Sequence, residues 1–185
     1  RDGSAAAARE LLREMVRAGV APNVISYSSA ITACAKQRDG SAAAARELLR
    51  EMVRAGVAPN VISYNSTIEA CAKQRDGSAA AARELLREMV RAGVAPNVIS
   101  YNSVITACAK QRDGSAAAAR EVHREMVRTG VKPSVITYNS MITACAKQRD
   151  GSAAAARELL REMVHVGVHP DVITYNSTIT ACANQ

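Results

Sequence analysis

The chain of 185 residues contains no Phe and no Trp, so Ala, Leu, Val, Ile and Met must fill its core, which suits thin layers of helices. Its formal charge of +7, from 24 Lys and Arg against 17 Asp and Glu, fits either a polyanionic partner or a solvated basic surface. No apolar run reaches the roughly 20 residues of a membrane span, and the N-terminus lacks the pattern of a signal peptide, so we expect a soluble protein.

The same sequence is written five times with a period of 37 residues, which begins at Arg1, Arg38, Arg75, Arg112 and Arg149. A fixed period of about 20 to 50 residues is typical of solenoids, in which each repeat packs against its neighbours. The positions that differ between copies are then the candidates for specificity. Among them we single out two sets of equivalent positions, residues 28, 65, 102, 139 and 176, together with 60, 97, 134 and 171.

Each period predicts two helices. The first is traced over Ser26–Lys36, where Tyr27, Ile31 and Cys34 follow the i, i+4, i+7 spacing of one buried stripe. Ser26 is the predicted N-cap, because its hydroxyl can accept a hydrogen bond from a backbone N–H group of the first turn. The equivalent residues of the other copies are Ser63, Ser100, Thr137 and Thr174.

A turn over residues 37–40 then separates the helices, and Ser41 is expected to cap the second one, which runs from about Ala42 to Ala55. Gly56 ends this helix. Its predicted apolar face consists of Ala45, Leu48, Leu49 and Met52. The Arg and Glu residues between them alternate in sign, which predicts a solvated and internally balanced outer face.

One cysteine recurs in each repeat, at Cys34, Cys71, Cys108, Cys145 and Cys182. A spacing of one full repeat fits neither a zinc site nor a disulfide framework. The neighbours are Ile, Ala and Thr, so we expect these residues to pack in the core as small apolar side chains. Free thiols of this kind indicate a reducing compartment.

From Val98, the sequence VISYNSVITACAK, a Gly turn, the Glu-Met pair and the Gly-Val-x-Pro block resemble the pentatricopeptide repeat (PPR) family over the whole chain. The resemblance implies an all-α fold, a right-handed superhelical solenoid of helix-turn-helix repeats. The common repeat of the family has 35 residues, whereas this one has 37. The near identity of the copies indicates either recent duplication or a consensus-style design.

In the frame of the family, each motif opens at Val24, Val61, Val98, Val135 or Val172. The chain then forms a single array. It consists of a second-helix half repeat at 1–23, whole repeats at 24–60, 61–97, 98–134 and 135–171, and a first-helix half repeat at 172–185.

The resemblance implies binding of single-stranded RNA, one base per repeat, because a flexible strand exposes the Watson–Crick edges of its bases. The base-reading residues are the fifth of each motif and the last before the next motif. They pair as Ser28 with Asn60, Asn65 with Asn97, Asn102 with Ser134, and Asn139 with Asp171, while Asn176 stands alone. By the family's code this array reads 5′-A-(C/U)-C-U-(C/U)-3′.

Two further sets complete the implied RNA site. The second residue of every motif is an isoleucine, which either clamps a base between apolar surfaces or packs in the core; these are Ile25, Ile62, Ile99, Ile136 and Ile173. A lysine ends the first helix in four copies, where it suits both RNA phosphates and the helix C-terminus; these are Lys36, Lys73, Lys110 and Lys147.

Nothing in the sequence predicts an enzyme. His123, His165 and His169 occur singly on or after second helices, so we expect surface positions, no metal site and no cofactor. The alternative function is a protein- or peptide-binding scaffold, because helical arrays offer a concave groove. The family resemblance implies a mitochondrion or plastid, although no targeting segment is seen. The terminal half repeats also favour end-to-end association of separate chains.

Overall fold

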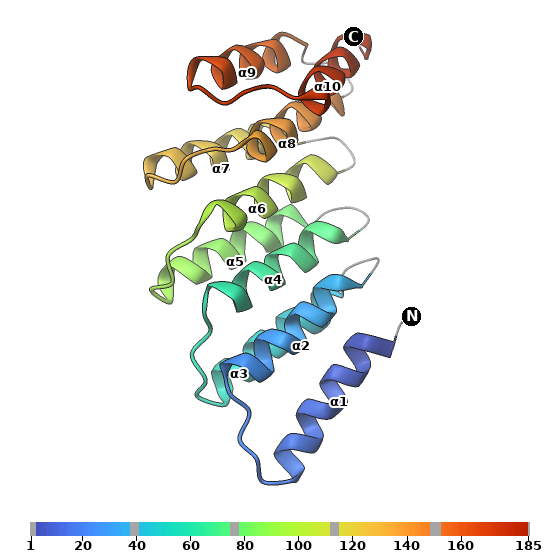
Figure 1. Ribbon diagram of the computed structural model, residues 1–185, viewed down its shortest axis with the longest axis vertical. Helices are drawn as coiled ribbons and strands as arrows, with labels where there is room; N and C mark the ends of the chain where they lie inside the picture. The colour runs from blue at the N-terminus through green and yellow to red at the C-terminus, as the bar shows by residue number, and fades with distance from the viewer. Residues whose placement is uncertain (1–2, 38–40, 75–77, 112–114, 149–152, 185) are drawn as a thin grey trace. The chain divides into compact units, whose positions relative to one another are not determined.

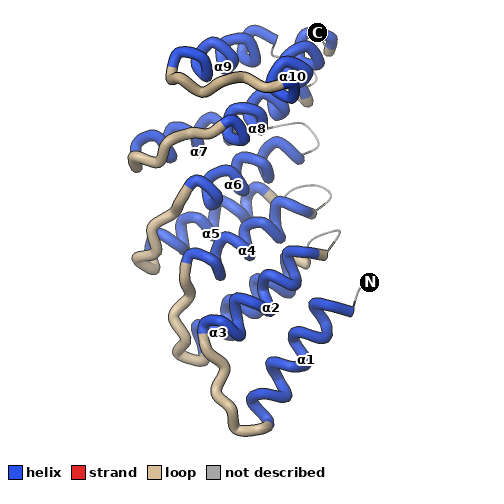
Figure 2. The backbone as a smooth tube through the Cα atoms, viewed as in Figure 1, coloured by secondary structure: helices blue, strands red, loops and turns tan. Residues whose placement is uncertain are grey.

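The computed structural model describes residues 3–37, 41–74, 78–111, 115–148 and 153–184. The regular structure of these segments is entirely helical, as expected (Figure 2). The helices are α1 (Gly3–Arg17), α2 (Val24–Lys36), α3 (Ala42–Arg54), α4 (Val61–Lys73), α5 (Ala79–Arg91), α6 (Val98–Lys110), α7 (Ala116–Arg128), α8 (Val135–Ala146), α9 (Ala153–His165) and α10 (Val172–Ala183). We call the even-numbered helices first helices and the odd-numbered ones second helices. None of them is both long enough and apolar enough to cross a membrane.

The chain forms two compact units, one with α1 to α4 and nearly all of α5, the other with α6 to α10. In the first unit α2 packs against α1, α3 and α4 (Figure 1). In the second unit α8 packs against α6, α7, α9 and α10. A first helix therefore contacts the next first helix as well as second helices, which is the packing of a helical-repeat protein.

The first helices begin earlier than predicted. The N-cap residues are Asn23, Asn60, Asn97, Ser134 and Asp171, all in extended conformation. The prediction of Ser26 as N-cap was therefore wrong by three residues. Ser26 instead occupies the third helical position, where its side chain accepts a hydrogen bond from the cap's backbone N–H while the cap side chain accepts one in return. This reciprocal capping box satisfies two N–H groups that the helix leaves free.

The two ends of the second helices differ in how well the sequence predicts them. Ser41 and Ser115 do precede helices, but their side chains make no capping hydrogen bond. The predicted turn at residues 38–40 lies outside the described residues. Gly56 ends α3 as predicted, with φ of +73°, and the backbone N–H of Val57 donates to the carbonyl of Met52 at 3.0 Å. Glycine is required there because other residues rarely adopt positive φ.

The predicted apolar stripes form the core. Tyr27, Ile31 and Cys34 of α2 are no more than 2% exposed. They meet the face of α3 formed by Ala45, Leu48, Leu49 and Met52, which is equally buried. All five cysteines are free and four are buried, which confirms their packing role. Burial raises the pKa of the Cys34, Cys71 and Cys145 thiols and keeps them protonated.

The outer face of the second helices is balanced in charge, as predicted. Glu47 lies 3.0 Å from Arg54 and 3.7 Å from Arg50, and the same pattern recurs around Glu10 and Glu84. These side chains are about half exposed, so each pair contributes little to stability.

His123 contradicts the prediction of a surface position, because it is only 7% exposed. It stands where Leu12, Leu49, Leu86 and Leu160 occur in the other copies. Its ring packs edge-on to Tyr138, and Nε2 lies 3.9 Å from Glu162 Oε1 without a hydrogen bond. Burial lowers the pKa of His123, an effect that the nearby Glu162 partly opposes.

Glu162 also accepts a hydrogen bond from the Tyr138 hydroxyl, at 3.3 Å. Burial, helped by this carboxylate, raises the pKa of Tyr138 to about 12. The carboxylate thus holds the tyrosine hydroxyl and leaves the buried imidazole nitrogen unsatisfied. His165 and His169 are exposed, as predicted.

We predict that His123→Leu raises the free energy of unfolding by about 1 to 3 kcal/mol at neutral pH, because it removes a buried unsatisfied polar atom. The difference should grow as pH falls below the ordinary imidazole pKa, since the unfolded chain then binds a proton that the folded chain resists. Urea unfolding at several pH values measures both effects. Exposed His165→Leu is the control, and an equal gain in both variants would contradict the prediction.

Candidate nucleic-acid interface

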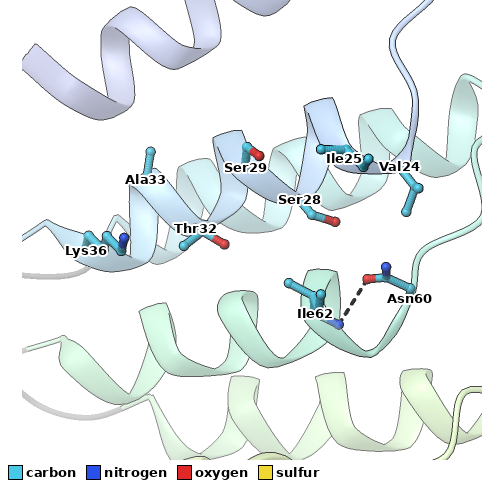
Figure 3. Close-up of a pocket in the computed structure, with 9 residues that line it drawn as sticks. All are labelled: Val24, Ile25, Ser28, Ser29, Thr32, Ala33, Lys36, Asn60 and Ile62. Carbon is cyan, nitrogen blue, oxygen red and sulfur yellow. Dashed lines mark hydrogen bonds between the residues drawn. The ribbon is translucent and has the colours of Figure 1, made fainter.

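A cleft of about 430 Å³ lies between the first helices α2 and α4 (Figure 3). It brings together Ser28 and Asn60, the pair predicted to read the first base, with the predicted base clamps Ile25 and Ile62 and the predicted phosphate contact Lys36. Ser28 points from α2 toward α4, and Asn60 stands at the start of α4. Residues that are far apart in the sequence thus form one site because consecutive first helices pack side by side.

Two polar residues of this cleft, Ser28 and Asn60, are joined through hydrogen bonds of the buried Ser63. The Asn60 side-chain oxygen Oδ1 accepts from the backbone N–H groups of Ile62 and Ser63, both at 3.0 Å, and from the Ser63 hydroxyl at 3.1 Å. The Ser63 hydroxyl also lies 2.8 Å from that of Ser28. The Asn60 Nδ2 group makes no hydrogen bond to the described residues, so its hydrogens are available to a ligand.

The third predicted pair meets in the second unit. Asn102 Nδ2 donates to Ser134 Oγ at 3.2 Å, and the Thr137 hydroxyl donates to Asn102 Oδ1 at 2.6 Å. Asn102 lies on α6, whereas Ser134 and Thr137 belong to the start of α8. The fifth residue of one motif is thus held by the residues that begin the next first helix.

The fourth pair repeats this arrangement with a charge. Asn139 Nδ2 donates to Asp171 Oδ1 at 3.0 Å, and the Thr174 hydroxyl donates to Asn139 Oδ1 at 2.6 Å. Hydrogen bonds from the Thr174 backbone and then from the Asn139 side chain lower the pKa of Asp171. Its carboxylate is therefore charged at neutral pH and can only accept hydrogen bonds.

Three predicted reading residues remain. Asn65 lies on α4 in the first unit, and Asn97 caps α6 in the second unit. Asn176 lies on α10 and is exposed. It lines a second cleft, of about 590 Å³, together with Lys147 and Asn184.

The isoleucine at the second motif position is solvent-exposed on every first helix. Ile25, Ile62, Ile99, Ile136 and Ile173 are between 55% and 70% exposed. Core packing therefore does not explain them. Large apolar side chains that recur on the surface beside polar clefts are typical of binding sites.

The four lysines are not equivalent. Lys36, Lys110 and Lys147 are exposed, whereas Lys73 is engaged twice. Its Nζ donates to the carbonyl of Ala35 at 2.9 Å and lies 2.7 Å from Glu69. Asn184 Nδ2 donates to the carbonyl of Ala146 at 2.9 Å in the corresponding place. These side chains satisfy a carbonyl at the C-terminus of the preceding first helix.

Sequence reasoning missed two features of this surface. Glu69 is the only acidic residue within the five first helices and replaces the Thr of the other copies, a signal already visible in the sequence. The second is a set of hydroxyl contacts between first helices, such as Thr32 with Ser66 at 2.8 Å and Thr106 with Ser140 at 3.2 Å. Only the packed structure identifies those partners.

Comparisons with known proteins agree with this architecture. The family model described as the pentatricopeptide repeat domain matches residues 10–74, 47–111, 84–148 and 121–185. A search of curated protein sequences gives no match.

Two solved structures of the maize pentatricopeptide repeat protein PPR10 are similar to the chain. One superimposes with a TM-score of 0.82 at 25% identity and covers 98% of this chain and 25% of the maize chain. The other, in complex with an 18-nt psaJ RNA element, has a TM-score of 0.75 at 28% identity and covers 94% of this chain and 24% of that one. The chain thus spans about a quarter of the maize protein.

The PPR domain of Arabidopsis thaliana protein-only RNase P 1, in complex with tRNA, superimposes with a TM-score of 0.79 at 17% identity. The match covers 98% of this chain and 92% of that domain, and it shows a shared fold. The family model matches four tandem stretches of the chain, and the helices repeat every 37 residues. The chain therefore belongs to the pentatricopeptide repeat family.

Proposed function

We propose that the chain binds single-stranded RNA and that consecutive first helices read consecutive bases. The cleft between α2 and α4 carries this proposal, because it places two exposed isoleucines beside two polar side chains and a lysine. The maize relative in complex with an RNA element supports the same ligand class. The net charge of +7 favours a polyanion as well.

The chemistry of the site suits a single strand. The isoleucines offer apolar surfaces to base faces, in place of the aromatic platforms that the first helices lack on this surface. The paired polar side chains offer hydrogen bonds to the base edges, which a duplex hides. By the family's code the strand read is 5′-A-(C/U)-C-U-(C/U)-3′, with Ser28 and Asn60 on the first base.

The first test compares this strand, a scrambled strand of the same composition and the corresponding DNA by fluorescence anisotropy. We expect the matched RNA to bind tightest, with each mismatched base costing about 1 to 3 kcal/mol. Ser28→Asn is the matched variant, and it should move the preference at the first base from A to a pyrimidine. Equal affinity for all strands would contradict sequence reading and favour a peptide-binding scaffold.

Glu69 gives a prediction about the phosphate contacts, since its carboxylate neutralises Lys73 at 2.7 Å. We propose that Lys73 contacts RNA less strongly than the three exposed lysines. Glu69→Gln should raise the affinity for RNA. It should also steepen the slope of log binding constant against log salt concentration by about 0.7, the value for one phosphate contact on a single strand.

Glu47→Gln is the control for this prediction, because it changes the net charge by the same amount on the outer face of α3. Affinity titrations over a range of salt concentrations give both slopes. Equal effects of the two substitutions would show that net charge alone, and not Lys73, governs binding.

We also propose that the isolated 185-residue polypeptide stacks end to end. Leu11 of α1 is 64% exposed, whereas its counterparts Leu48 and Leu159 are at most 1% exposed. Tyr175 and Ile179 of α10 are 53% and 65% exposed, although the same residues of the inner first helices are buried. In α10 the face with which the inner first helices pack is therefore exposed. We expect α1 of the next copy to pack against this face.

Light scattering should therefore give a mass that rises with protein concentration, and Leu11→Glu should return the chain to a monomer because it places a charge in the apolar contact. Val53→Glu is the control, since Val53 is 52% exposed on the outer face. A wild-type chain that stays monomeric at high concentration would disprove the stacking.

A further inference from the structure

We propose that the third residue of the first helices α4, α8 and α10, each of which follows another first helix, is a positioning residue for base recognition, which fixes the donor and acceptor pattern that the preceding repeat shows to its base. The residues are Ser63, Thr137 and Thr174, each with a hydroxyl on the reading side chain of the preceding repeat. All three are 0% exposed, so they do not touch a base themselves. The inference rests on the proposed RNA binding.

In the first unit the proton assignments follow from elementary chemistry. Asn60 Oδ1 can only accept, so the Ser63 hydroxyl donates its single proton to it, at 3.1 Å. The contact of 2.8 Å between Ser63 and Ser28 is then donated by Ser28. Ser28 Oγ therefore shows lone pairs to the cleft, and Asn60 shows its Nδ2 hydrogens.

This pattern of an acceptor beside a donor complements one class of base edge. Adenine offers an amino donor next to the ring acceptor N1, so both hydrogen bonds can form. Guanine, which is the same size, offers a carbonyl acceptor next to an N–H donor, so it meets like groups at both positions. The proton held by Ser63 thus separates the two purines by polarity rather than by size.

The fourth pair gives the opposite pattern by the same reasoning. The Asp171 carboxylate only accepts, so the Asn139 atom 3.0 Å away must be Nδ2. The Thr174 hydroxyl lies 2.6 Å from Asn139 Oδ1 and 2.9 Å from Asp171 Oδ1, and its single proton is assigned to the shorter contact. A carboxylate acceptor and the second Nδ2 hydrogen are left for the base. They complement the N–H donor and carbonyl acceptor of uracil.

Without the hydroxyl of Ser63, nothing holds the proton of the Ser28 hydroxyl in one direction. The hydroxyl of Ser28 would be free to rotate and donate to the guanine carbonyl, which removes one of the two mismatches that guanine meets in this cleft. Buried and fully paired polar groups hold one orientation, which is why the hydroxyl determines specificity without contacting RNA.

The sequence supplies a matched control for the experiment. Ser26 makes the same capping box with Asn23 as Ser63 makes with Asn60, and among the described residues the Ser26 hydroxyl forms hydrogen bonds only with Asn23. Ser26→Ala and Ser63→Ala therefore remove equivalent capping interactions, and only the second removes a contact to a reading residue. Thermal unfolding followed by circular dichroism establishes that both variants fold.

The measurement is the ratio of affinities for strands with A or G at the first base. We expect Ser63→Ala to lower this ratio about three- to tenfold, the effect of one hydrogen bond, while Ser63→Thr retains it. Ser26→Ala should leave the ratio unchanged. If Ser63→Ala leaves the ratio unchanged, or if Ser26→Ala lowers it equally, the positioning role is overturned. If the wild-type chain shows no preference between the two strands, the proposed base reading itself is overturned.

Discussion

The hydrogen-bonded seam between consecutive first helices is the interaction on which the rest of the structure depends. Between α2 and α4 it consists of the contacts of Ser28 with Ser63 and of Thr32 with Ser66, both at 2.8 Å. Buried hydroxyls must find partners, so they fix how the two helices meet. Once this register is set, the apolar stripes face the second helices and the isoleucines are left at the surface.

The start of each first helix serves the fold and the candidate site together. The cap side chain accepts hydrogen bonds from the first turn and also lines the cleft with its remaining polar atoms. Asn, Ser and Asp are all strong N-caps, so this position can change identity while the helix still begins at the same residue. The variation at residues 60, 97, 134 and 171 thus alters the chemistry of the cleft at little cost to stability.

Departures from perfect repetition act locally, because each repeat contacts only its neighbours. His123 replaces a core leucine between α7 and α8, and Tyr138 and Glu162 are the groups that respond to it. Glu69 changes the environment of Lys73 in the same way. Helix α7 keeps Ala119, Val122 and Met126 in its buried stripe, and α4 keeps Tyr64, Ile68 and Cys71.

The sequence by itself determined the period, the two helices per repeat, their buried stripes and the glycine ends, because these depend on residues within a few positions of each other. Through the family frame it also indicated residues that line the cleft between α2 and α4. Only the tertiary structure decided the partners of the hydroxyls, the burial of His123 and the bond from Lys73 to the carbonyl of Ala35. Those contacts join residues about one repeat apart, 38 positions for Lys73, and no local pattern specifies which side chains packing brings within hydrogen-bond distance.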